Sequence, residues 1–182
     1  MKLNKVMMAT VLALGVSSTA FAADQGHGKV TFTGSIIDAP CSITPESIDQ
    51  TVELGQISNV ALKNGGKSNP RPFSIDLENC SFEADAQGYP QKNKVAVTFT
   101  GMESSSVSGL LGITGTAQGA GVAITDGSGD VISLGQPTKT QTLQDGNNTL
   151  SFSAYLQGAA ASTAAIVPGD FQAVADFTLA YN

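Results

Sequence analysis

Apolar and polar residues alternate with a period of two along most of this chain. The pattern begins at Gly28, where Val30, Phe32 and Ile36 alternate with polar residues and Gly34 stands in the apolar row. Successive side chains of a strand point to opposite faces of a sheet, so this pattern is typical of a strand with one buried face. The glycine in that face requires an explanation.

The same alternation predicts further short strands, separated by stretches rich in Gly, Pro, Asn and Asp at 63–72, 125–130 and 144–148. The expected strands are Ile36–Cys41, Thr51–Leu54, Phe73–Leu77, Lys94–Thr100, Leu110–Thr114, Gly121–Thr125, Val131–Leu134, Thr149–Gln157 and Phe171–Tyr181. Short strands spaced in this way, with no long helical stretch, favour a single all-β domain of the immunoglobulin-like sandwich type.

The first 22 residues are typical of a secretory signal peptide. Lys2 and Lys5 form a basic start, an apolar run extends from Val6 to Val16, and Ala20-Phe21-Ala22 provides a small-x-small cleavage site. The apolar run is shorter than the roughly 20 residues that a membrane anchor requires. Cleavage after Ala22 would leave 182 − 22 = 160 residues, enough for one domain with a core.

Charge excludes one class of partner. The whole chain has 9 basic and 15 acidic residues, and removal of Lys2 and Lys5 leaves 7 − 15 = −8. A strongly acidic protein repels phosphate backbones and anionic lipids, so we expect no nucleic-acid binding.

The chain has two cysteines, Cys41 and Cys80. In an exported protein an even number favours an intramolecular disulfide, with two free buried thiols as the alternative. Their spacing excludes a catalytic CxxC motif. A metal site is not favoured either, because His27 is the only histidine.

No pattern of residues indicates catalysis. His27 lies among glycines near the expected mature N-terminus, with no nucleophile placed beside it. Asp126 and Asp130 could serve as an acid–base pair or bind calcium, but their glycine-rich setting fits a hairpin turn better. The glycines of 115–121 lack the Lys-Ser/Thr of a phosphate loop. We therefore expect no enzyme, no cofactor and no small-molecule substrate.

The two ends of the chain and the cysteines together resemble a known family. The head Gly28–Ile43 reads GKVTFTGSIIDAPCSI, and the tail Val167–Asn182 reads VPGDFQAVADFTLAYN. With Cys80, these segments resemble the pilin subunits of chaperone–usher fimbriae, most of all the major rod subunits of the P-pilus and mannose-resistant fimbria group. Gly169 matches the glycine that is fourteenth from the C-terminus in those subunits, and Tyr181 matches their next-to-last aromatic residue.

The resemblance implies an incomplete immunoglobulin-like β-sandwich that lacks its last strand. The chain ends after Phe171–Tyr181, which would be the sixth strand of the seven-strand fold. The gap leaves a hydrophobic groove with an unpaired sheet edge, which is prone to aggregation. In the family, a periplasmic chaperone first lends a strand. The N-terminal extension of the next subunit then replaces it at the outer-membrane usher, which is the known process of donor-strand complementation.

The resemblance also divides the chain into a signal peptide (1–22), a donor-strand extension (23–35) and a pilin domain (36–182). The alternating positions implied for the donor strand are Gly28, Val30, Phe32, Gly34 and Ile36, with Gly34 fitting a shallow part of the groove. The residues implied for the strand that borders the groove and contacts the chaperone are Gly169, Phe171, Ala173, Ala175, Phe177, Leu179, Tyr181 and Asn182. The alternative is that Gly28–Ile36 forms the first strand of its own domain.

In function, the resemblance implies a structural subunit of a surface fimbrium that is exported through the periplasm, polymerises head to tail and supports adhesion. Its partners would be the chaperone, the usher and neighbouring pilin subunits. One alternative is a minor subunit or adhesin-type binding module of the same system, and another is a self-contained secreted sandwich. A single domain with a donor segment favours the shaft, because adhesins of the family have a separate receptor-binding domain and lack that segment.

Overall fold

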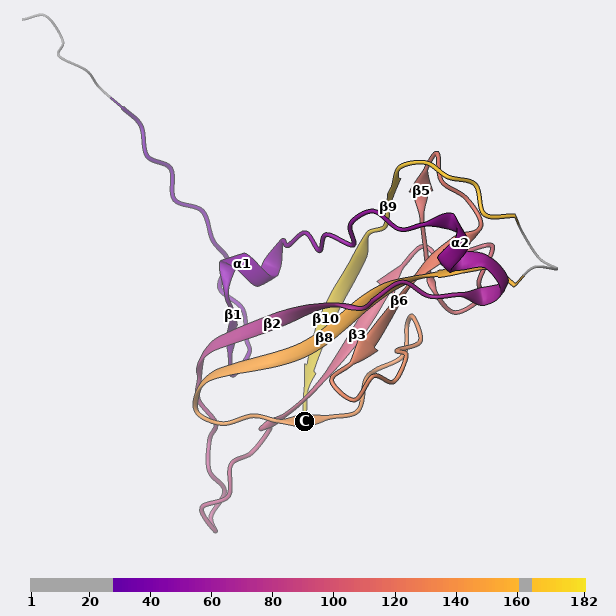
Figure 1. Ribbon diagram of the computed structural model, residues 1–182. Helices are drawn as coiled ribbons and strands as arrows, with labels where there is room; N and C mark the ends of the chain where they lie inside the picture. The colour runs from indigo at the N-terminus through magenta and orange to yellow at the C-terminus, as the bar shows by residue number, and fades with distance from the viewer. Residues whose placement is uncertain (1–27, 161–164) are drawn as a thin grey trace, which may run out of the picture. The chain divides into compact units, whose positions relative to one another are not determined.

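The computed structural model describes residues 28–160 and 165–182 of the 182-residue chain (Figure 1). The compact unit spans Ile37–Asn182, and Gly28–Ile36 belongs to a separate unit without regular secondary structure. The predicted signal peptide and His27 lie outside the described residues. No helix in the described part is long and apolar enough to cross a membrane.

The larger of the two main sheets has five antiparallel strands in the order β1-β2-β8-β6-β4. Its strands are β1 (Ser42–Ile43), β2 (Arg71–Cys80), β4 (Leu111–Gly112), β6 (Ala120–Asp126) and β8 (Gly146–Gly158). The longest ladder joins β2 to β8, with Phe73 opposite Phe152 and Ile75 opposite Leu150. Strand β8 lies in the middle of this sheet and is paired on both sides.

The second main sheet has the order β10-β3-β7, and a separate small sheet pairs β5 with β9. The strands are β3 (Lys94–Gly101), β5 (Thr114–Gly115), β7 (Gln141–Thr142), β9 (Phe171–Gln172) and β10 (Ala175–Tyr181). The helical segments are short: α1 (Pro45–Ile48), α2 (Asn59–Leu62) and the 3-10 turn η1 (Lys63–Gly65).

The two main sheets pack against each other through phenylalanine rings. The Phe73 and Phe152 rings of the larger sheet stack with centroids 5.6 Å apart, and Phe99 of β3 meets Phe152 edge-on at 5.2 Å. Phe177 of β10 extends this cluster with its centroid 6.5 Å from that of Phe99. Such contacts add specificity to the burial of large apolar surfaces.

The strand order matches an immunoglobulin-like sandwich with one position unfilled. In that fold one sheet has strands A, B, E and D and the other has C, F and G. Here β1-β2-β8-β6 corresponds to A-B-E-D, and β3 and β10 correspond to C and F. Within the described residues β10 pairs with β3 alone, so the position of strand G beside it has no strand. The predicted fold class is confirmed.

The expected strand Ile36–Cys41 is wrong, because this stretch is irregular and the first pairing begins at Ser42. Pro40 has no N–H to donate to a ladder, and its carbonyl instead accepts from the Ser81 N–H at 3.0 Å.

Two other expected strands are also absent. Thr51–Leu54 has no ladder partner, although its alternation persists as half-buried Val52 and Leu54. In Val131–Leu134 a single bridge joins Val131 to Thr125, and the chain then turns at Gly135, whose φ is +75°.

The remaining expected strands are present with altered bounds. Leu110–Thr114 divides into β4 and β5, which pair with different neighbours. Phe171–Tyr181 likewise divides into β9 and β10, because β9 joins the small sheet and β10 joins β3.

Candidate functional site

An open groove runs between β10 and the irregular segment 49–57, with a volume of about 1230 Å³. Its apolar floor comes from four strands of both sheets: Phe73, Ile75, Phe99, Val122, Ile124, Ala154 and Leu156. Pockets for small molecules commonly measure about 300–1,000 Å³, so this groove is large for such a ligand. Its long shape beside a strand suits an extended peptide better.

One side of the groove is the final stretch of the chain, where burial alternates residue by residue. The residues that face the groove and core are half-buried, and those between them are exposed. The half-buried set is Phe171, Ala173, Ala175, Phe177, Leu179 and Tyr181. This alternation is the one expected from the sequence. Phe171, Ala173, Ala175 and Phe177 line the groove, and Leu179 and Tyr181 pack against the core beyond it. The role of the whole row in binding a donated strand or the chaperone stays a prediction.

The backbone of β10 presents an unpaired edge to the groove. Lys94 and Asn182 exchange two hydrogen bonds, of 3.1 and 2.8 Å. In an antiparallel ladder only alternate residues bond to a given neighbour, so the residues between them turn their N–H and C=O groups to the opposite edge. In β10 these residues are Ala175, Phe177, Leu179 and Tyr181. Ala175 and Phe177, which line the groove, thus also carry free backbone groups, and the free edge continues along β10 to Tyr181.

The irregular segment 49–57 forms the opposite side of the groove. The alternation at 51–54 predicted two of its inward residues, Val52 and Leu54, but not Ile57. All three residues line the groove. Side chains rather than a strand cover the neighbouring edge of β2. The Asp76 N–H donates to Ser47 Oγ at 2.9 Å, and Gln50 Nε2 donates to the Ser74 carbonyl at 3.0 Å. This side therefore has partly satisfied backbone, whereas the β10 side does not.

Gly169 closes one end of the groove, and its lack of a side chain has a visible reason. A Cβ at this position would contact Thr116 Oγ1 and would lie 2.7 Å from the Ala117 backbone nitrogen. The adjoining Asp170 carbonyl accepts from the Thr116 and Ala117 N–H groups at 3.0 and 3.1 Å. The glycine thus lets the chain that leads into β9 approach the loop after β5.

Tyr181 lies at the other end of β10, and its hydroxyl oxygen is buried without a hydrogen-bond partner among the described residues. Burial raises the pKa of this hydroxyl above its usual value, because the ionised form would lose its hydration. An unsatisfied buried polar atom on the edge strand β10 is unusual in a native structure, where such groups nearly always have a partner.

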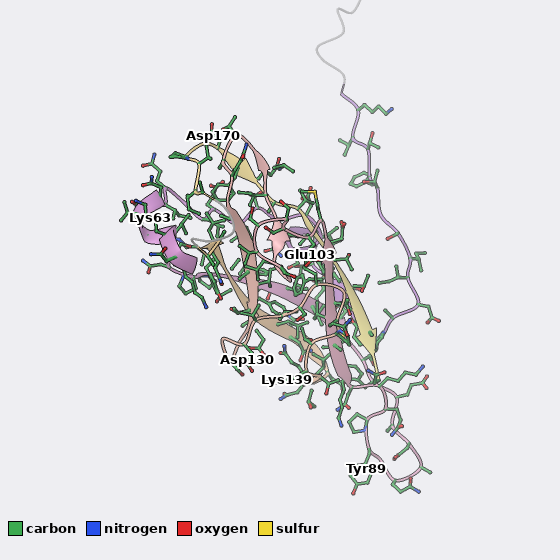
Figure 2. All side chains as sticks on the ribbon, turned by 90° about the vertical axis from the view of Figure 1, so that its right-hand side faces the viewer. Lys63, Tyr89, Glu103, Asp130, Lys139 and Asp170 are labelled. Atoms are coloured by element: carbon green, nitrogen blue, oxygen red, sulfur yellow. A yellow bond between two sulfur atoms is a disulfide. The ribbon has the colours of Figure 1, made fainter. Side chains whose placement is uncertain are left out.

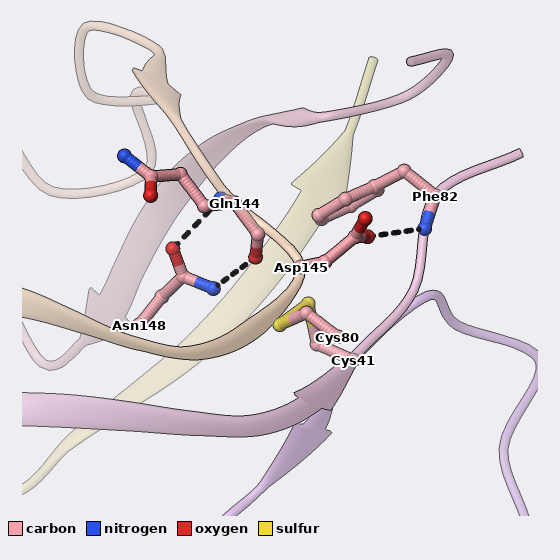
Figure 3. The surroundings of a disulfide bond; sticks show 6 residues. All are labelled: Cys41, Cys80, Phe82, Gln144, Asp145 and Asn148. Atoms are coloured by element: carbon pink, nitrogen blue, oxygen red, sulfur yellow. Dashed lines mark hydrogen bonds between the residues drawn. A yellow bond between two sulfur atoms is a disulfide. The ribbon is translucent and has the colours of Figure 1, made fainter. Parts of the chain in front are cut away.

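A disulfide joins Cys41 to Cys80, so the predicted pairing is confirmed (Figure 3). Beside it the Phe82 N–H donates to Asp145 Oδ1 at 3.0 Å, and the amide of Asn148 bonds the Gln144 backbone in both directions. The link ties the start of the domain to the end of β2. For a loop with a sequence separation of 39, chain entropy predicts a contribution of about 4 kcal/mol.

The predicted donor residues expose their apolar side chains. Val30, Phe32 and Ile36 are 75%, 90% and 104% exposed. A Cβ at Gly34 would meet no atom of the described residues within 4 Å, so no contact within that part of the chain explains the glycine. The segment belongs to the smaller of the two units of the chain, and its role as donor stays a prediction.

The residues considered for chemistry have structural roles. Asp126 Oδ1 accepts from the Ser128 and Asp130 N–H groups at 2.9 and 3.0 Å, as in a hairpin turn. Asp130 pairs with Lys139 at 2.7 Å, and this contact lowers the pKa of the carboxyl. In the described part of the chain no three His, Cys, Asp or Glu side chains gather as a metal site would require.

Comparison with known proteins gives the family. The model of the family described as "Fimbrial protein" matches residues 30–182. The chain belongs to the fimbrial protein family. It is 66% identical to the Fimbria A protein of Serratia marcescens over 182 residues, which cover the whole of both chains. It is 56% identical to the Major MR/P fimbria protein of Proteus mirabilis, again over the full length of both.

A solved structure supports the same conclusion about this fimbrial subunit. The chain matches a subunit of a chaperone–usher pilus, from a study of rod uncoiling, with a TM-score of 0.75 and 36% identity. The match covers 87% of this chain and 97% of the other. The protein is therefore a structural, non-enzymatic subunit of a surface fimbrium, and it polymerises with neighbouring pilin subunits.

Proposed function

We propose that the groove accepts the segment Gly28–Ile36 of a neighbouring copy as its seventh strand. One observation carries the proposal. A groove with an unpaired edge at β10 and a segment with exposed Val30, Phe32 and Ile36 occur in the same chain. The groove exposes apolar surface and unpaired backbone to water, and the segment exposes apolar side chains. The segment could cover the apolar surface of the groove and pair with its open edge.

The length of the segment agrees with the length of the stretch that it would lie beside. Nine extended residues, 28–36, span about 30 Å, and the eleven residues of Phe171–Tyr181 span somewhat more at about 3.3 Å per residue. Burial of each large apolar side chain would contribute roughly 1.5–3 kcal/mol. Each new ladder hydrogen bond would add about 1 kcal/mol net. Since each copy both donates and accepts, the contact repeats head to tail into an open fibre.

The divisions of the chain follow from this role. Residues 1–22 act as a signal peptide, 23–35 as the donor extension and 36–182 as the pilin domain. Before assembly the open edge needs a temporary partner, because an exposed apolar edge aggregates. A periplasmic chaperone fills that need by lending a strand to β10 and holding the Asn182 carboxylate. The outer-membrane usher is then the place of exchange. The 56% sequence identity with the Major MR/P fimbria protein favours a role as the major rod subunit.

The test is deletion of residues 23–35 in a cell that produces the fimbrium. The shortened subunit should still accumulate in complex with the chaperone, because its groove is intact, but electron microscopy should find no fibres. The matched control replaces these residues with a scrambled segment of the same composition. Normal fibres from the deletion variant would overturn the assignment of the donor.

A further inference from the structure

We propose that Lys63, at one end of the groove, forms an ion pair with Asp38 of the neighbouring copy that fills the groove. This inference rests on the proposed function and extends it. It adds an electrostatic contact between the bodies of successive subunits to the strand that joins them.

Charge is unevenly distributed along the domain. Four acidic residues and no basic one occur between Val30 and Leu62: Asp38, Glu46, Asp49 and Glu53. Three basic residues and no acidic one occur between Leu54 and Ile75: Lys63, Lys67 and Arg71. In a chain that is acidic overall, the second stretch is locally cationic, and its exposed basic side chains suit an anionic partner.

The groove has two ends with different neighbours. At one end Leu62 of α2 packs in the same cluster as Phe171 and Ala173. Toward the other end Ile43 and Phe177 line the groove, and Leu179 and Tyr181 follow Phe177 along β10. Figure 2 shows Lys63 and Asp170 toward the same end of the domain, with Tyr89 at the opposite end. Lys63 follows Leu62 directly, so it marks the Phe171 end.

The direction of the inserted strand decides which end receives the body of the neighbour. Neighbouring strands in this fold are antiparallel, and β10 runs from Ala175 to Tyr181. A strand beside it therefore places Ile36 near the Phe171 end of the groove. Asp38 follows two residues later, within about 7 Å along the backbone. The neighbour's Asp38 thus arrives next to Lys63.

Lys63 is the cation best placed to receive it. The Lys67 ammonium already lies 5.1 Å from the centre of the Tyr155 ring, and the Arg71 guanidinium lies close to where a Cβ on Gly55 would stand. Lys63 is exposed and has no carboxylate within 4 Å among the described residues. Asp170 lines the groove at the same end. Its negative charge would repel Asp38, and the positive charge of Lys63 would offset that repulsion.

Zero-length cross-linking of native fibres tests the geometry directly. A water-soluble carbodiimide joins a lysine amine to a nearby carboxylate as an amide, and the carbodiimide takes up the water that is lost. Mass spectrometry of the covalent dimer band should identify a Lys63–Asp38 link. In fibres of Lys63→Arg the link should vanish while the fibres remain, because the guanidinium keeps the charge but does not couple. A dimer band in which Asp38 is joined only to Lys92 or Lys94 would overturn the proposal.

Charge reversal tests the energetics. Lys63→Glu and Asp38→Lys should each lower the amount of surface fibre by about three- to fivefold, the effect expected of an exposed pair. The combined variant should recover most of the loss, whereas Lys92→Glu, with the same change in charge, should leave the amount unchanged. A combined variant no better than the worse single variant would contradict the pairing.

The two proposals fail in different ways. If deletion of residues 23–35 leaves fibres intact, the proposed function is wrong and this inference falls with it. If the deletion abolishes fibres but neither the cross-link nor the charge rescue is found, only the ion pair is wrong.

Discussion

Strands β8 and β10 carry the same alternation of apolar and polar residues, but they bury it to different depths. Leu150 and Phe152 of β8 are each 1% exposed, whereas Phe177 and Leu179 of β10 are only half-buried. The difference comes from their neighbours. β8 lies between β2 and β6, and β10 has β3 on one side and the open groove on the other.

The comparison divides the domain into a fully paired side, around β2, β8 and β6, and an open side, along β10 and the groove. The fully paired side contains the disulfide, the longest ladder and the stacked aromatic rings that hold the domain together. The open side leaves apolar surface in the groove and unpaired backbone groups on β10. A fibre subunit needs both, because an isolated copy must fold far enough to be recognised yet must gain stability by joining.

The largest expected effect comes from completing the open side within one chain. A second copy of Gly28–Ile36, joined after Asn182 by a short flexible linker, can turn back antiparallel to β10. Three buried side chains at roughly 1.5–3 kcal/mol each should raise the free energy of unfolding by several kcal/mol. Denaturant unfolding measures it. A control copy with serine at the three apolar positions should give no gain, and an equal gain from that control would contradict the model of strand insertion.

The next effect separates the two strands directly. Phe152→Ala should lower the free energy of unfolding by about 3–5 kcal/mol, as for a fully buried aromatic residue. Phe177→Ala should cost less than half as much, because its ring is partly in solvent. In the chain with the appended strand, Phe152→Ala and Phe177→Ala should lower the free energy of unfolding by similar amounts. Equal costs without the appended strand would show that the β10 side is already closed.

A smaller effect distinguishes two glycines of the site. Gly169→Ala should destabilise the domain by about 1–3 kcal/mol, since the added Cβ crowds Thr116 and the Ala117 backbone. Gly34→Leu should leave the melting temperature of the subunit unchanged but lower the yield of fibres, because that position matters only inside the neighbour's groove. Thermal unfolding and electron microscopy, applied to both variants, check the pair. A fall in melting temperature for Gly34→Leu would refute this division of roles.

The smallest effect concerns pH. The pKa of Tyr181 is raised in the folded chain, so the unfolded chain releases this proton first as pH rises past about 10. Stability should therefore be independent of this group below that pH and fall above it. Tyr181→Phe should reduce the fall, as unfolding measured from pH 8 to 11 would show. The same slope in the variant and in the wild type would exclude Tyr181 as its source.

Prediction from the sequence succeeded where alternation was long and failed where pairing was short. The inward residues Leu150, Phe152, Ala154 and Leu156 of β8 are all buried as the pattern indicated. Thr51–Leu54 has a similar pattern but pairs with no strand of the described chain, because two inward residues alone do not fix a partner. Phe171–Tyr181 was predicted as one strand, and only the contacts of β5 and β3 show that it divides.

For the groove, the sequence indicated one side well and the other only in part. The row from Phe171 to Tyr181 was recognisable from its period, and Gly169 from its position in the tail. At 51–54 the alternation marked Val52 and Leu54, but the pattern says nothing about which element an irregular segment lies against. Ile57 and the hydrogen bonds of Ser47 and Gln50 to β2 could not be inferred, because they join residues that are distant in sequence.

By itself the sequence determined which residues face inward, the pairing expected of two cysteines in an exported chain, and the resemblance to fimbrial subunits. These are local properties or properties of composition, and a period of two is enough to assign faces. Only the tertiary structure decided that β10 lies at an edge, that a groove of about 1230 Å³ opens beside it, and that Leu62 of α2 lines this groove. The depth of burial depends on which strands become neighbours, and that is a property of the whole fold.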